Sequence, residues 1–123
     1  MSHQKCVLIV DDEPINLLIL SQVLKPCFAV FACKSGEEAL QVARRIPKPD
    51  LVILDILMPG MDGYMTLFKL RQDPETADIP VIFISALSNG ADLQKGLELG
   101  AVDFIVKPFE SEDIMTRVKA QLH

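Results

Sequence analysis

The sequence predicts an α/β protein in which five parallel strands alternate with five helices. Short apolar runs rich in Val, Ile and Phe recur along the chain, and most do not alternate with polar residues. Such runs are typical of strands that helices cover on both faces of a parallel sheet. The segments between the runs are long enough for a helix and two loops. The five predicted strands are Cys6–Val10, Phe28–Ala32, Leu51–Leu54, Val81–Ile84 and Phe104–Val106.

The intervening segments carry the start and stop signals of helices. Pro14 suits the first turn of a helix that runs to about Leu24. Ser35 with Glu38 three residues later forms a capping box ahead of apolar residues at helical spacing. Right-handed crossovers should wind this (βα)5 pattern into a three-layer, flavodoxin-like doubly wound sheet of order 2-1-3-4-5. The other predicted helices contain Met65, Phe68 and Leu70 and end near Asp73, run from Asp92 to Leu99 with Gly100 as the cap, and run from Ser111 to Leu122.

Composition narrows the class of protein. The chain has 123 residues, of which 50% are hydrophobic, so we expect one hydrophobic core and one domain over residues 1–123. Twelve Lys and Arg against 17 Asp and Glu give a net charge of −5, which argues against direct nucleic-acid binding. Three cysteines without a CxxC pair, and no apolar stretch long enough for a signal or membrane span, predict a cytoplasmic protein. His3 and His123 stand at the two ends, which excludes a histidine-based site in the core.

Chemically active side chains follow four of the predicted strands. In open parallel sheets, ligands bind outside the carboxyl ends of the strands. Asp11 and Asp12 follow the first strand, Asp55 the third, Ser85 the fourth and Lys107 the fifth. We therefore expect these five residues to meet at one rim of the sheet. The alternative, that each Asp is only a turn residue or a helix cap, fits one such residue better than all of them together.

The charges at this rim predict a divalent metal ion. Crowded carboxylates raise one another's pKa unless a positive charge lies among them. Lys107 offsets one of the three carboxylates, and a divalent cation offsets the other two. Hard oxygen ligands in this number favour Mg²⁺, for which Mn²⁺ can substitute.

At these residues the sequence resembles the receiver domain of two-component response regulators, over about Lys5 to Leu122. Each matching segment alone is a modest signal, but together they occur in the family's order and spacing. The segments are Val10–Pro14, Asp55–Gly63, Ile84–Ala86 and Gly100–Phe109.

The resemblance implies a phosphoryl acceptor and its metal site. Asp55 would accept a phosphoryl group from a phosphohistidine on a histidine kinase or a histidine phosphotransfer protein. Asp12, Asp55 and the backbone carbonyl of Leu57 would bind Mg²⁺ directly, and Asp11 would act through a metal-bound water. The chain would then be a phosphorelay switch, and its chemistry would be confined to its own phosphorylation and dephosphorylation.

The resemblance also implies how the phosphoryl group is held and reported. The Ser85 hydroxyl, the Ala86 backbone N–H and Lys107 would bind phosphoryl oxygens, and a cis peptide between Lys107 and Pro108 would direct the lysine. Ser85 and Phe104 would act as switch residues, with a plain core role as the alternative for Phe104. The loop 87–90 and the face made by the last two helices and the last strand would change, and that face would contact an output domain, a downstream protein or a second copy of the chain.

The helix over Pro14–Leu24 carries a second hypothesis. Asn16, Ile19, Leu20, Val23 and Leu24 share one helical stripe, which predicts that Leu17 and Leu18 point outward beside the acidic rim. Exposed leucines are ordinary on protein surfaces. The functional interpretation is a docking patch, made of Leu17 and Leu18, for the kinase or phosphotransfer partner.

Other functions fit the sequence less well. A dehalogenase-type phosphatase needs an Asp where Leu57 stands, a flavin site would be repelled by Asp11 and Asp12, and no P-loop motif is present. The alternative that remains open concerns context. The chain also resembles input domains of longer regulators that carry a cyclic-dinucleotide synthase or phosphodiesterase, or a hybrid histidine kinase.

Overall fold

The five predicted strands form one parallel sheet. The computed structural model describes residues 4–45, 47–86 and 90–122, so expectations for His3, His123 and most of the loop 87–90 lie outside the described residues. The strand order is β2-β1-β3-β4-β5, which confirms the predicted order 2-1-3-4-5. The strands are β1 (Cys6–Val10), β2 (Ala29–Cys33), β3 (Leu51–Asp55), β4 (Val81–Ser85) and β5 (Asp103–Val106).

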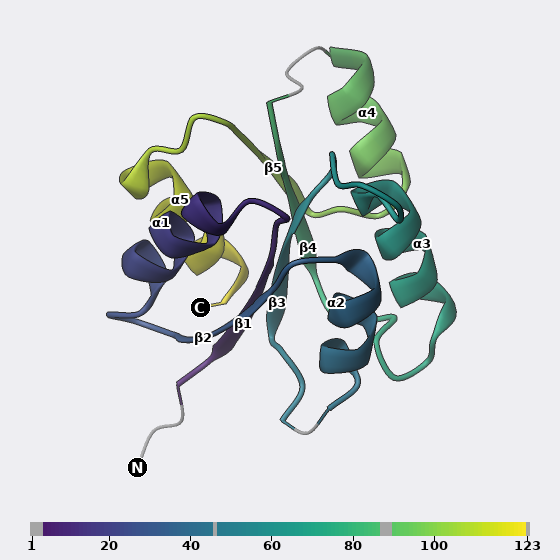
Figure 1. Ribbon diagram of the computed structural model, residues 1–123, viewed down its shortest axis with the longest axis horizontal. Coiled ribbons are helices and arrows are strands. Elements are labelled where there is room, and N and C mark those ends of the chain that lie inside the picture. The colour runs from purple at the N-terminus through teal and green to yellow at the C-terminus, as the bar shows by residue number, and fades with distance from the viewer. Residues whose placement is uncertain (1–3, 46, 87–89, 123) are drawn as a thin grey trace.

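Helices cover both faces of the sheet, as the (βα)5 pattern predicts. In Figure 1, α1 and α5 lie on one face, and α2, α3 and α4 lie on the other. None of the helices within the described residues is long and apolar enough to cross a membrane. The helices are α1 (Pro14–Leu24), α2 (Gly36–Ala43), α3 (Gly63–Gln72), α4 (Gly90–Glu98) and α5 (Ser111–Gln121).

Burial distinguishes the three central strands from the two edge strands, β2 and β5. Every residue of β1, β3 and β4 is buried, because each of these strands has a neighbour on both sides and helices above and below. The expectation of covering on both faces, made for most of the strands, does not extend to β2. Phe31 and Ala32 of β2 are exposed, since β2 lies at the edge of the sheet.

Local capping fixes where the helices begin. The Ser35 hydroxyl accepts a hydrogen bond from the Glu38 backbone N–H at 3.1 Å, which confirms the predicted cap. Glu38 reaches back to the Lys34 N–H at 2.9 Å, one residue before the position expected for a capping box. At the start of α3, the Asp62 carboxylate accepts from the Met65 N–H at 2.9 Å. Asp62 thereby starts α3 within eight residues of the end of β3.

The orientation of α1 differs from the prediction. Leu17 is buried against the sheet with 8% of its surface exposed, together with Leu20 and Leu24. Leu18 is 53% exposed, and Ile19, predicted to face inward, is also exposed. The error has a physical reason: α1 is apolar around most of its circumference, so its pattern does not fix which stripe faces the core.

The strand register brings the predicted site residues together at the carboxyl ends of the strands. Val10 pairs with both Cys33 and Leu54, and Asp55 pairs with Ile84. Ser85 pairs with Val106, the residue before Lys107. Because parallel strands in this register end together, the residues that follow β1, β3, β4 and β5 converge.

Gly63 provides a test of this packing. A methyl group at Gly63 would collide with the Asp55 carbonyl oxygen and lie 2.7 Å from the Ile56 Cα, and neither backbone atom can move freely. We expect Gly63→Ala to lower the free energy of unfolding by about 2–3 kcal/mol, measured by urea denaturation. Gly90→Ala is the matched control, because nothing lies within 4 Å of the added methyl group. Equal stability of the two variants would contradict the close approach of α3 to β3.

Candidate functional site

Asp11 is held at the end of β1 by backbone hydrogen bonds. Its N–H donates to the Cys33 carbonyl at 3.1 Å, which extends the pairing of β1 with β2 by one residue. Its Oδ1 accepts from the Glu13 N–H at 3.0 Å. The Asp11 side chain is fully buried. The carboxylate is therefore fixed before any ligand arrives.

Asp55 and Lys107 are positioned by the same extension of the sheet. Asp55 is the last residue of β3 and is 1% exposed, and the next N–H, of Ile56, donates to the Ile84 carbonyl at 3.1 Å. The Lys107 N–H donates to the Ser85 carbonyl at 2.9 Å. Lys107 and Asp55 thus lie on either side of the end of β4, with their side chains at the same rim.

The Lys107 ammonium group connects the carboxylates. Its Nζ lies 3.1 Å from Asp11 Oδ2 and 3.5 Å from Asp55 Oδ2. A third carboxylate oxygen, Glu13 Oε1, lies 3.8 Å from the same nitrogen. Burial alone would lower the pKa of Lys107, but the hydrogen bond to Asp11 and the charges of Asp55, Asp11 and Glu13 raise it. Lys107 therefore stays protonated and supplies the positive charge of the site.

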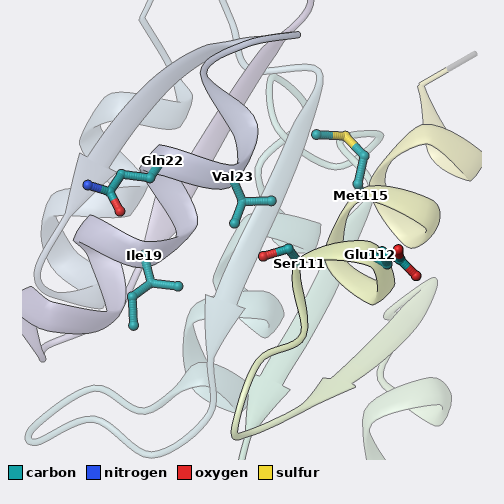
Figure 2. Close-up of a pocket in the computed structure, with 6 residues that line it drawn as sticks. All are labelled: Ile19, Gln22, Val23, Ser111, Glu112 and Met115. Carbon is teal, nitrogen blue, oxygen red and sulfur yellow. The ribbon is translucent and has the colours of Figure 1, made fainter.

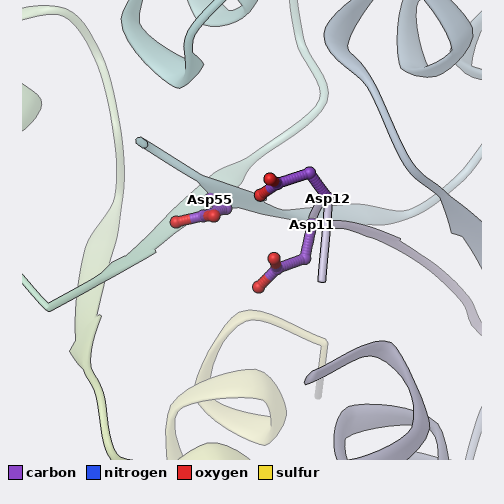
Figure 3. Close-up of side chains that lie close together, drawn as sticks. All are labelled: Asp11, Asp12 and Asp55. Atoms are coloured by element: carbon purple, nitrogen blue, oxygen red, sulfur yellow. The ribbon is translucent and has the colours of Figure 1, made fainter. Parts of the chain in front are cut away.

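Three carboxylates form a candidate metal centre. Figure 3 shows Asp11, Asp12 and Asp55 extending to the same side of β1 and β3, and one oxygen of each lies within 4.8 Å of the others. Asp55 Oδ1 is buried and has no hydrogen-bond partner among the described residues. A buried carboxylate oxygen without a donor is costly unless a cation binds it. The donor set, made of carboxylate oxygens, fits Mg²⁺ or Mn²⁺.

The charge of Asp55 is destabilised without such a cation. Its pKa is raised from 3.8 to about 7, first by burial and then by the negative charge of Asp11, while Lys107 opposes the shift. One lysine is therefore not enough to offset the neighbouring carboxylates. A divalent ion at this position would lower the pKa of Asp55 and keep the carboxylate ionised at neutral pH.

The remaining predicted residues lie around this centre. Ser85 is buried at the end of β4, Ala86 is exposed beside it, and the Lys107–Pro108 peptide bond is cis. The Leu57 side chain points into solvent, so only its backbone can face the site. Phe104 is buried against Phe83, with ring centroids 6.5 Å apart. Its proposed switching role stays a prediction.

Sequence reasoning assigned no role to Glu13 and Asn16. The Asn16 amide donates to Glu13 Oε1 at 3.2 Å, and this carboxylate joins the ion pairs of Lys107. Asn16 had been predicted to lie on the inward stripe of α1. The position of Glu13 in the sequence, directly after Asp11 and Asp12 at the same strand end, was the feature that could have indicated its place in the site.

Comparison with known proteins identifies the family. The model of the response regulator receiver domain family matches residues 7–119. The chain belongs to this family. A crystal structure of a putative response regulator from Chloroflexus aurantiacus is similar to this receiver domain with a TM-score of 0.89 and 37% identity, over 98% of both chains.

Two curated relatives are much longer than this receiver domain. A probable cyclic di-GMP phosphodiesterase of Vibrio cholerae is 43% identical over 119 residues, which are 97% of this chain and 27% of the relative. The response regulator PleD of Caulobacter vibrioides is 39% identical over 115 residues, which are 93% of this chain and 25% of the relative. The chain thus spans about a quarter of these two proteins.

Replacing Asp55 tests the charge balance of the site. The raised pKa means that the folded state binds this proton more tightly than the unfolded state, so ionising Asp55 costs stability as the pH rises from about 4 to about 7. In EDTA, we expect Asp55→Asn to be more stable than the wild type by about 1–3 kcal/mol above pH 7, and the difference to shrink toward pH 4. Urea denaturation across this pH range measures it.

Adding Mg²⁺ provides the control for this experiment. The ion should stabilise the wild type and act much more weakly on Asp55→Asn, because the variant lacks one charged ligand. A difference in stability that does not change with pH would contradict the proposed charge crowding.

Proposed function

We propose that this receiver domain is a phosphorelay switch in which Asp55 accepts a phosphoryl group from a phosphohistidine. The donor is a histidine kinase or a histidine phosphotransfer protein. The observation that carries the proposal is the buried Asp55 carboxylate, held 3.5 Å from Lys107 and grouped with Asp11 and Asp12. A nucleophile of this kind needs neighbouring positive charge to approach an anionic phosphoryl group.

The proposed reaction is an in-line displacement. A carboxylate oxygen of Asp55 attacks the phosphorus, the bond from phosphorus to the histidine nitrogen breaks, and the electron pair of that bond returns to the nitrogen. Lys107, the Ser85 hydroxyl and the Ala86 backbone N–H bind the phosphoryl oxygens. Asp12, Asp55 and the Leu57 carbonyl would hold Mg²⁺, with Asp11 acting through a water, and the ion would supply further charge neutralisation.

The proposed output arises from the charge added to Asp55. An acyl phosphate brings extra negative charge and new acceptor oxygens, which Ser85 and Lys107 can reach. Phe104 lies on β5 beside this site and packs on Phe83. We place the responding face on α4, β5 and α5, where Leu97 of α4, Val106 of β5 and Val102, directly before β5, are exposed apolar side chains. This face would contact an output domain, a downstream protein or a second copy.

Small acyl phosphates test the phosphoryl acceptor directly. We expect the wild type with acetyl phosphate and Mg²⁺ to gain the mass of one phosphoryl group, measured by intact mass spectrometry. Asp55→Asn should gain none, because an amide cannot form the acyl phosphate. Lys107→Met should label slowly, because it keeps the Asp55 nucleophile but removes the positive charge that would bind the phosphoryl oxygens. Equal labelling of the wild type and Asp55→Asn would refute the assignment of Asp55.

The docking patch on α1 stays a proposal, and the structure changes which residues form it. Leu17 is part of the core and leaves the patch, which now consists of Ile15, Leu18 and Ile19, all exposed. Figure 2 shows Ile19 on the α1 side of a groove of about 470 Å³ between α1 and α5, with Met115 on the opposite side. Ile19 also lines the groove that reaches Lys107. This continuity supports docking of a helix from the phosphohistidine donor, whose apolar side would cover the patch.

A negative charge introduced into the α1 patch should slow phosphorylation by protein donors but not by small-molecule donors. We expect Leu18→Glu combined with Ile15→Glu to slow phosphotransfer from an autophosphorylated histidine kinase at least about fivefold, because a carboxylate in an apolar contact must be desolvated. Phosphorylation by acetyl phosphate should be unchanged. Phe68→Glu, at an exposed position of α3 on the other face of the sheet, is the matched control. Equal loss with both donors in the patch variant would refute the docking surface.

A second candidate concerns the whole protein. The relatives from Vibrio cholerae and Caulobacter vibrioides extend well beyond the matched region. The alternative is that this receiver domain is the input segment of a longer regulator with an enzymatic output, such as a cyclic-dinucleotide phosphodiesterase or synthase, or of a hybrid kinase. Reading the coding sequence on both sides of the chain distinguishes these cases.

A further inference from the structure

A second groove, of about 460 Å³, opens directly beside Lys107. Ile19 of α1 and the residues after β5, Pro108 and Phe109, provide apolar walls. Glu13 and Lys107 provide the charged groups. Since Lys107 lies 3.5 Å from Asp55, a phosphoryl donor that reaches Asp55 through this groove passes both charges.

The Glu13 carboxylate is held at this groove by two interactions. Its Oε1 accepts a hydrogen bond from the Asn16 amide at 3.2 Å and lies 3.8 Å from the Lys107 ammonium group. Its side chain is 60% exposed, so the carboxylate remains in contact with solvent and with anything that enters. Among the described residues that line this groove, Glu13 is the one acid. Its charge therefore acts on Lys107 and also on any donor that enters the groove.

We propose that Glu13 determines which phosphoryl donors the site accepts. It favours donors whose phosphorus is bonded to a positively charged nitrogen, and it disfavours donors that release a carboxylate. The inference rests on the proposed function, because it assumes that Asp55 is the acceptor, and it adds a residue that selects among donors.

The selection follows from the charge of the leaving group. In phosphoramidate or a protonated phosphohistidine, an oxygen of Asp55 bonds to phosphorus while the P–N bond breaks. The electron pair returns to a nitrogen that began with positive charge, and a neutral amine or imidazole leaves. In acetyl phosphate the P–O bond breaks instead, and the electron pair leaves with acetate. The second reaction builds negative charge on the departing oxygen.

Lys107 links Asp55 to Glu13, and the proposal takes the leaving group to lie near Glu13. The leaving atom lies opposite the attacking Asp55 oxygen in an in-line displacement, and the oxygens between them face Lys107. Because Lys107 also lines the groove that contains Glu13, a leaving group on the far side of the phosphorus would enter this groove. A carboxylate there attracts the nitrogen cation and repels the acetate, with an energy that falls as salt screens the charges. The apolar walls also suit the flat ring of an imidazole.

The test compares two small donors on the same protein. The second-order rate constants for phosphorylation of Asp55 by phosphoramidate and by acetyl phosphate are measured with Mg²⁺ for the wild type and Glu13→Gln. We expect the ratio of the phosphoramidate rate to the acetyl phosphate rate to fall about three- to tenfold in Glu13→Gln at low salt. High salt should reduce this change. Glu13→Asp, which keeps the charge, should retain a ratio close to that of the wild type.

Glu75→Gln is the matched control. It removes the same charge from an exposed position between α3 and β4, beside Lys48 and Asp50, which precede β3, and far from the carboxyl ends of the strands. An unchanged ratio in Glu13→Gln, or the same change in Glu75→Gln, would overturn the role of Glu13. If the wild type is not phosphorylated at Asp55 by either donor, the proposed function itself fails and this inference fails with it.

Discussion

The contact between Lys107 and the buried carboxylates is the interaction on which the site depends. Lys107 Nζ lies 3.1 Å from Asp11 Oδ2 and 3.5 Å from Asp55 Oδ2, and it is the cation that lies among them within the described residues. A buried acid without a positive neighbour would be protonated or would destabilise the fold. The single lysine is insufficient even so, since the pKa of Asp55 is raised to about 7. The same deficit of positive charge that weakens the fold favours the binding of a divalent cation, which the proposed phosphoryl transfer would need before an anionic phosphoryl group could approach.

The parallel sheet holds these crowded charged side chains in place. Asp11, Asp55 and Lys107 each sit where a strand of the parallel sheet ends, and backbone hydrogen bonds to Cys33, Ile84 and Ser85 extend the strands into the site. Gly63 allows the start of α3 to approach the backbone of Asp55 and Ile56 without a side chain between them. The positions of the charged groups are therefore fixed by backbone structure, and little rotamer freedom is lost when a ligand binds.

In the proposed function, the rim residues carry out the chemistry, and the surfaces around the rim contact other proteins. In this proposal the carboxylates and Lys107 would serve the phosphoryl transfer, and the groove that Glu13 lines would face the donor. The exposed side chains of α1 lie next to this groove, because Ile19 lines both grooves. On the other side, Phe104 of β5 packs against Phe83 of β4 and lies close to Gly96 of α4. The family membership establishes a receiver domain, whereas the donor, the metal ion and the output remain proposals that the variants above test.

The sequence alone determined the five strands, the helix starts at Pro14 and Ser35, and the rim residues, because each follows from local pattern and from the alignment of parallel strand ends. Tertiary structure decided what local pattern leaves open. The edge position of β2 exposes Phe31, which the apolar run does not reveal. The apolar circumference of α1 hides its orientation, so only packing against the sheet shows that Leu17 is buried and Leu18 exposed. The Glu13 carboxylate lies at the site because it pairs with Lys107, a residue more than ninety positions away in the sequence. Such a contact depends on where the fifth strand lies in the folded sheet.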